Sequence, residues 1–224
     1  RDWSSDVCSS DLFLPLFLNI HLFAQPVPQK SITTQSCAVV TASPYASMAA
    51  LDVMKKGGNA FDAAIATQLA LAVVYPNAGN IGGGGFLVGH THNGKSIAID
   101  YREKAPGSAG RDMYLDAQGN PNMNLSQFGH LASGVPGTVA GLFASHAYGK
   151  MSFQDLIEPA IQLAEKGFVI TASEARSLNG NKASFEKYNT VSPVFVKNTS
   201  WKEGDTLIQP QLASTLKRIR DNGK

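Results

Sequence analysis

The chain has 224 residues, of which 43% are hydrophobic and 16% charged; this composition suits one sizeable globular domain and argues against a disordered protein. Its net charge of +2 gives no reason to expect a nucleic acid or a membrane surface as a partner. The two cysteines, Cys8 and Cys37, are too few for a disulfide scaffold.

The N-terminal region reads as two segments that precede the domain. Residues 1–12 (RDWSSDVCSSDL) show no hydrophobic period and resemble translated sequencing-adapter sequence, so we interpret them as a non-native leader, with a genuine polar tail as the alternative. Residues 13–24 form an apolar run that ends in Ala24, typical of a secretory signal and too short to span a bilayer. The alternative is a buried N-terminal helix. We expect an exported protein, periplasmic or extracellular, with residues 25–224 forming an incomplete domain.

Two helices are predicted before the first long strand. Ser43 as N-cap and Pro44 at the first helical position start one helix, which Gly57 ends. Asn59 caps a second helix that continues to about Val74. This helix is rich in alanine and nearly apolar all round, so we expect it to be buried between other layers.

A β-hairpin is predicted next. Residues 86–91 and 95–102 read as strands, and Asn93-Gly94 between them is the strongest short signal for a hairpin turn. In the second strand, Ile97, Ile99 and Tyr101 are predicted to face one way, and Ser96, Ala98, Asp100 and Arg102 the other.

The hairpin also contains two patterns that resemble ligand sites. Residues 89–96 (GHTHNGKS) formally match a phosphate-binding P-loop, but that loop needs a helix after it, and a strand is predicted here. His90 and His92 would share a strand face, yet no cysteine or third histidine nearby completes the three or four ligands of a zinc site. We therefore predict neither a nucleotide site nor a metal site.

The remaining elements indicate layered packing. A short strand is predicted at residues 39–40, and helices at about 136–148, 153–166 and 209–221. Helices on both flanks of an apolar hairpin favour an α/β or α+β fold.

Two features around the hairpin are candidates for a site. The glycines of residues 82–85 suit a backbone that passes tightly against a ligand or another segment, and core packing is at least as well supported as ligand contact. Arg102 lies at the end of an apolar strand, where we expect a partly buried guanidinium that needs an anion. Its planar fork matches a carboxylate in bidentate fashion. An internal ion pair with Glu103 or Asp112 is equally compatible with the sequence.

Several stretches, in matching order and spacing, resemble the γ-glutamyltransferase (glutathione hydrolase) family, and together they span roughly residues 38–223. They are ASPYASMAALDVMKKGGNAFDAAIA at 42–66, NIGGGGF at 80–86, IDYREKAPGSAGRDMYLD at 99–116, GVPGTVAGL at 134–142 and WKEGDTLIQPQLASTLKRIRDNG at 201–223.

This resemblance implies an N-terminal-nucleophile hydrolase, an αββα sandwich that is incomplete here. In the family a zymogen cuts itself by autoproteolysis, and the new N-terminal threonine of the small subunit attacks the γ-glutamyl carbonyl, with its own amine as base. The acyl group then passes to water, an amino acid or a peptide, without a cofactor. The resemblance implies that this chain is the first part of the large subunit, so that the catalytic threonine lies beyond Lys224. The implied partners are a γ-glutamyl substrate and the small subunit, with no nucleic acid and no stable membrane insertion.

The resemblance also assigns a role to the candidate arginine. Arg102, in the DYREKAP stretch, corresponds to the residue that binds the α-carboxylate of the γ-glutamyl group, and Glu103 is a candidate for orienting it. Rival hypotheses are a relative that acts on cephalosporin side chains or poly-γ-glutamate, and a non-catalytic binding protein that keeps the fold. The intact DYREKAP stretch favours γ-glutamyl compounds such as glutathione.

Overall fold

The computed structural model describes residues 33–223, which belong to two compact units, Arg1–Ala38 and Val39–Lys224. The predicted leader (1–12) and signal segment (13–24) lie outside the described residues. In the first unit, residues 33–38 have no regular secondary structure, and Cys37 is an exposed free thiol. No helix among the described residues is long and apolar enough to cross a membrane.

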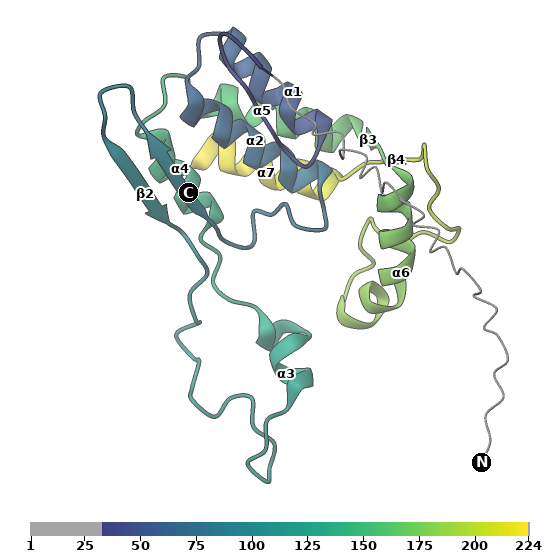
Figure 1. Cartoon of the computed structure of the whole chain (residues 1–224). Helices are drawn as coiled ribbons and strands as arrows, with labels where there is room; N and C mark the ends of the chain where they lie inside the picture. The colour runs from purple at the N-terminus through teal and green to yellow at the C-terminus, as the bar shows by residue number, and fades with distance from the viewer. Residues whose placement is uncertain (1–32, 224) are drawn as a thin grey trace, which may run out of the picture. The chain divides into compact units, whose positions relative to one another are not determined.

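The second unit is mainly helical, with two small antiparallel sheets (Figure 1). The helices are α1 (Pro44–Lys55), α2 (Ala60–Val74), α3 (Met123–Gln127), the 3-10 helix η1 (His130–Ala132), α4 (Thr138–His146), α5 (Phe153–Lys166), α6 (Ala172–Tyr188) and α7 (Pro210–Asn222). The strands are β1 (Phe86–His90), β2 (Ser96–Asp100), β3 (Phe168–Val169) and β4 (Thr206–Leu207), with β1 paired to β2 and β3 to β4.

Helix α2 is the centre of the core, as its apolar composition predicts. It packs against α1, α4 and α5, and α5 in turn packs against α7. Its start is fixed by a capping box: the side chain of Asn59 accepts from the backbone N–H of Asp62, and the carboxylate of Asp62 accepts from the backbone N–H of Asn59. Pro44 begins α1 and Ser43 is its N-cap residue, as predicted, although the Ser43 side chain makes no capping hydrogen bond.

Asp62 also connects α2 to the turn between α4 and α5. Its side chain is fully buried, and its two oxygens accept from the backbone N–H groups of Asn59 at 2.8 Å, Lys150 at 3.0 Å and Met151 at 3.3 Å. A buried carboxylate is tolerated when backbone donors surround it. This residue therefore joins two segments that are 88 positions apart in the sequence.

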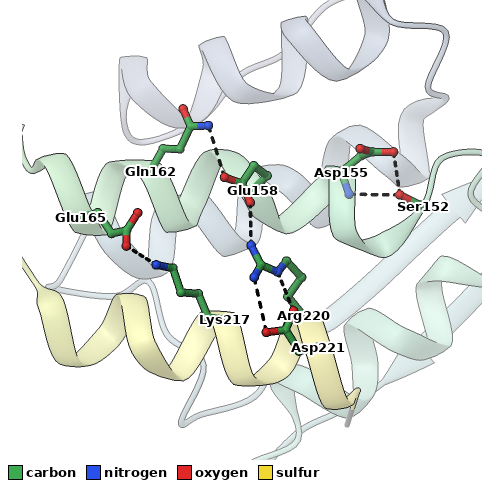
Figure 2. Close-up of polar contacts among 8 residues, drawn as sticks. All are labelled: Ser152, Asp155, Glu158, Gln162, Glu165, Lys217, Arg220 and Asp221. Atoms are coloured by element: carbon green, nitrogen blue, oxygen red, sulfur yellow. Dashed lines mark hydrogen bonds and ion pairs between the residues drawn. The ribbon is translucent and has the colours of Figure 1, made fainter.

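Helices α5 and α7 lie side by side, with ion pairs along their shared edge (Figure 2). Arg220 donates to Glu158 at 3.1 Å, and Lys217 pairs with Glu165. These side chains are half-exposed, and each such pair contributes about 1 kcal/mol or less. The contact depends instead on buried apolar side chains, namely Leu156, Ile157 and Ile161 of α5 and Leu216 of α7.

The predicted hairpin is confirmed. Strands β1 and β2 pair in antiparallel register, with Phe86 opposite Asp100 and His90 opposite Ser96, and Gly94 takes a positive φ of 84° in the turn. A strand, not a helix, follows the glycine and lysine, so the P-loop pattern is a hairpin turn. Both strands are slightly shorter than predicted.

The two faces of the hairpin differ in environment. On the inner face Ile97 is buried, and the backbone at Gly89 approaches the ring of Phe61 from α2 so closely that an added Cβ would lie 2.7 Å from it. On the outer face Phe86 is 64% exposed and Val88 84% exposed. Among the described residues, this outer face is uncovered.

The structure differs from the predicted elements in further places. Residues 39–40 are not a strand. Helices α3, η1 and α6 and the β3–β4 pair were not predicted. Helix α6 buries only Ala175 and Leu178, so its apolar period is weak, although Thr171 and Glu174 form a capping box that the sequence displays.

The burial of Asp62 yields a stability prediction. In the full-length protein, Asp62→Ala leaves buried backbone N–H groups without an acceptor, so we expect the melting temperature to fall by about 5 °C or more. The control is Asp52→Ala on the exposed side of α1, which we expect to change the melting temperature by about 1 °C or less. Equal melting temperatures for the two variants, measured by circular dichroism, would contradict the assigned role of Asp62.

Candidate functional site

The candidate site lies where the chain leaves β2. Tyr101, Arg102 and Glu103 follow the last residue of that strand and run between the glycine-rich loop at residues 82–85 and the start of α4. The loop and the start of the helix both contact this three-residue segment, as the following distances show.

The glycine-rich loop packs against the backbone of that segment. A Cβ added at Gly84 would lie 2.7 Å from both the Cα of Arg102 and the carbonyl oxygen of Tyr101, and one at Gly85 would lie 2.8 Å from the ring of Tyr101. At Gly82 an added Cβ would meet nothing within 4 Å. Of the two interpretations of the glycine run, the structure therefore supports packing against the chain itself for Gly84 and Gly85.

The N-terminal end of helix α4 contacts the same segment. A Cβ at Gly137 would lie 2.1 Å from the carbonyl oxygen of Tyr101, and one at Gly141 would lie 2.2 Å from its ring. The carbonyl oxygen of Gly83 accepts from the backbone N–H groups of Gly137 at 2.8 Å and Thr138 at 3.0 Å. Loop and helix are thus hydrogen-bonded to each other, with the Tyr101 backbone packed against both.

Tyr101 anchors the segment in the core. Its side chain is 8% exposed, and its hydroxyl donates to Oε1 of Gln68 on α2 at 2.9 Å. Burial raises the pKa of the Tyr101 phenol above its ordinary value of 10.0, so the hydroxyl stays a donor at neutral pH.

Arg102 points the opposite way and is exposed, so the expectation of a partly buried guanidinium was wrong for this chain. The strand ends two residues earlier, at Asp100, whose carboxylate accepts from the backbone N–H of Arg102 at 3.0 Å. The guanidinium carbon lies 5.7 Å from the centroid of the Phe86 ring, a cation–π distance on the outer face of the hairpin.

The internal ion pairs that the sequence left open are not formed. Within the described residues the guanidinium of Arg102 pairs with neither Glu103 nor Asp112, and Asp112 pairs instead with Arg111 at 3.0 Å. The donors of Arg102 are therefore available to an anion. Glu103 is exposed, and its role in orienting Arg102 stays a prediction.

The histidines that the structure describes form no ligand set. Nδ1 of His90 lies 3.2 Å from the hydroxyl of Ser96, and His92 lies in the turn beyond the strand. The described part of the chain contains no group of three or more histidine, cysteine or acidic side chains that could hold a metal ion.

The family follows from two matches. The sequence profile described as Gamma-glutamyltranspeptidase matches residues 46–224. The chain is 44% identical over 188 residues to the glutathione hydrolase proenzyme of Escherichia coli (strain K12), a match that covers 83% of this chain and 32% of that protein. The chain belongs to the γ-glutamyltranspeptidase family. It spans about a third of the length of this curated relative.

Solved structures of the family and its neighbours confirm the fold class. The γ-glutamyltranspeptidase of Helicobacter pylori superposes with a TM-score of 0.83 at 45% identity, over 86% of this chain and 56% of that chain. A cephalosporin acylase from Bacillus halodurans superposes with a TM-score of 0.69 at 25% identity, over 88% of this chain and 39% of that chain. The fold is therefore the α+β fold of N-terminal-nucleophile hydrolases, and the described residues contain two two-stranded sheets.

The candidate site includes residues of this family member that the sequence reasoning did not select. They are Asn80, Thr138, Gln68 and Phe86, which all contact the glycine-rich loop or the segment 101–103. Asn80 and Phe86 stand inside the NIGGGGF stretch and Thr138 inside GVPGTVAGL, so the matched motifs are the signal that could have found them.

The glycine packing yields a second prediction. In the full-length protein, Gly84→Ala forces the backbone at Arg102 to move, and we expect a loss of about 1–3 kcal/mol in stability. Gly82→Ala is the matched control because its Cβ meets open space, and we expect a change of about 0.5 kcal/mol or less, or a slight gain. Urea denaturation measures both. A Gly84→Ala variant as stable as Gly82→Ala would show that the loop is not packed as described.

Proposed function

We propose that this chain is part of a γ-glutamyltransferase that cleaves γ-glutamyl amides such as glutathione and transfers the γ-glutamyl group to water, amino acids or peptides. In this proposal Arg102 binds the α-carboxylate of the γ-glutamyl group. The observation that carries it is an exposed guanidinium that pairs with no carboxylate among the described residues, on a backbone that glycines and Tyr101 fix in place.

The chemistry of the arginine suits that substrate. A guanidinium presents two parallel N–H donors that match both oxygens of a carboxylate, which gives orientation as well as attraction. The ring of Phe86 lies beside the guanidinium at a cation–π distance, which favours its positive charge at this place. Fixing the α-carboxylate places the scissile amide, four bonds away, at a defined position relative to a nucleophile.

The nucleophile in this proposal is a threonine in a segment outside this chain. The relatives are named proenzymes, which supports a precursor that is cut into two subunits, the second of which carries the new N-terminal threonine. Thr138 of this chain is fully buried and donates to Asn80, so it does not serve as the nucleophile.

A second candidate is an acylase of the same fold, which the likeness to the cephalosporin acylase supports. The higher identity to proteins named glutathione hydrolase proenzyme favours the γ-glutamyl donor. A third candidate is a non-catalytic protein that keeps the fold. The full-length gene distinguishes it from the two enzymes, because a non-catalytic protein would lack the segment that begins with the threonine nucleophile.

Export to the periplasm or the extracellular space is also proposed. Its support is the apolar run at residues 13–24, which is typical of a signal sequence. The proposal is tested by determining the N-terminal sequence of the mature protein purified from its native source.

The test of the substrate role is Arg102→Ala in the full-length protein. We expect kcat/KM for γ-glutamyl-p-nitroanilide to fall by a factor that corresponds to about 2–5 kcal/mol, since a charge-assisted bidentate contact is lost. Part of the loss should appear in kcat, because the arginine also positions the amide. Arg102→Lys keeps the charge without the fork, so an intermediate loss is expected.

The matched control is Arg111→Ala, which removes an arginine whose side chain is 93% exposed and pairs with Asp112. We expect this variant to keep the parent kcat/KM. If Arg102→Ala also keeps it, the arginine does not bind the substrate and the proposed function loses its main support.

A further inference from the structure

Asn80 and Thr138 form a hydrogen-bonded connection beneath the glycine-rich loop. The hydroxyl of Thr138, a fully buried side chain, donates to Oδ1 of Asn80 at 2.7 Å. The same oxygen accepts from the backbone N–H of Gly83 at 2.9 Å. One amide oxygen thus binds both the loop and the first residue of α4, across 58 positions of sequence.

The connection continues to the backbone of Arg102. Gly83 is held at both ends, since its carbonyl oxygen accepts from the backbone N–H groups of Gly137 and Thr138. The next residue, Gly84, packs against the Cα of Arg102. The carbonyl oxygen of Gly85 then accepts from the backbone N–H of Tyr101 at 3.1 Å. A shift of the loop relative to α4 would therefore move the backbone that carries the guanidinium.

We propose that Asn80 and Thr138 are positioning residues that set the place of the Arg102 guanidinium, and so determine the preference of the enzyme for donors that carry an α-carboxylate. This inference rests on the proposed function of Arg102. In this proposal neither Asn80 nor Thr138 touches the substrate, and both act through the glycine-rich loop. A site must hold its binding groups to within about 0.5 Å, and residues behind the binding group supply that precision.

The readout is a ratio that a general loss of stability does not change. It is kcat/KM for γ-glutamyl-p-nitroanilide divided by kcat/KM for 4-aminobutanoyl-p-nitroanilide, which has the same acyl chain and amine but no carboxylate. We call this ratio the carboxylate preference. A displaced guanidinium lowers it, whereas damage to the nucleophile or to the fold lowers both rates together.

The variants are Thr138→Val and Thr138→Ser in the full-length protein. Valine has nearly the shape of threonine but cannot donate to Asn80, and serine keeps the hydroxyl. We expect Thr138→Val to lower the carboxylate preference about tenfold or more, since a misplacement of about 1 Å can reduce a rate a hundredfold. We expect Thr138→Ser to stay within about threefold of the parent.

The same substitution in an Arg102→Ala background completes a double-mutant cycle. There Thr138→Val should change the carboxylate preference by less than about twofold, because the group that it positions is gone. If Arg102→Ala alone leaves the preference unchanged, the proposed function fails, and this inference fails with it. If Arg102→Ala lowers the preference but Thr138→Val does not, or lowers both rates equally, the positioning role is overturned while the proposed function stands.

Asn80 provides an independent pair of variants if Thr138→Val does not fold. Asn80→Ala removes the shared acceptor, and Asn80→Asp keeps an oxygen at that place for both donors. We expect the alanine variant to lose carboxylate preference about tenfold and the aspartate variant to keep more of it than the alanine variant. Equal losses in the two variants would overturn the role of the hydrogen bonds.

Discussion

The structure around the candidate site depends on one steric constraint, the close approach of glycine backbones to the chain at Tyr101 and Arg102. Gly84 from the loop and Gly137, the N-cap residue of α4, leave no room for a Cβ against this backbone. Neither glycine has a positive φ, so they are required for space and not for backbone conformation. Because both neighbours are this close, the backbone of the segment has little freedom to shift. The Cα atom from which the Arg102 side chain extends is therefore held in place.

Tyr101 and Arg102 lie on the constrained backbone, and one of their side chains is buried while the other is exposed. Successive side chains of an extended segment point to opposite sides. Tyr101 is therefore buried against α2 and α4, and Arg102 is exposed on the outer face of the hairpin beside Phe86. The core thus fixes the backbone of the arginine while leaving its donors available to a ligand. Exposure in this chain is compatible with a binding role, since the guanidinium pairs with no carboxylate among the described residues.

Much of the fold could be predicted because its signals are local. The capping of α2 by Asn59, the proline at the start of α1 and the Asn93-Gly94 turn each depend on a few neighbouring residues, and all are confirmed. Helix α6 was missed because few of its side chains are buried, so it shows little apolar period. The expectation that Arg102 is partly buried was wrong because its side chain lies on the outer face of the hairpin, beside Phe86, which is itself 64% exposed.

The site itself was only partly predictable, and the reason is physical. A run of glycines indicates that another group approaches the backbone closely, but it does not indicate whether that group is a ligand or another segment of the chain. The answer depends on the backbone at Tyr101 and Arg102, which Gly84 and Gly85 contact only in the folded chain. Gly137, the N-cap residue of α4, lies more than fifty residues away and contacts the same backbone. The hydrogen bond between Asn80 and Thr138 could not be predicted from the sequence either. An asparagine after a helix and a threonine at the start of a helix are both common, so neither residue indicates its partner. The matched motifs thus meet in a contact between distant segments, in which Gly84 and Gly137 lie against the backbone at Tyr101 and Arg102.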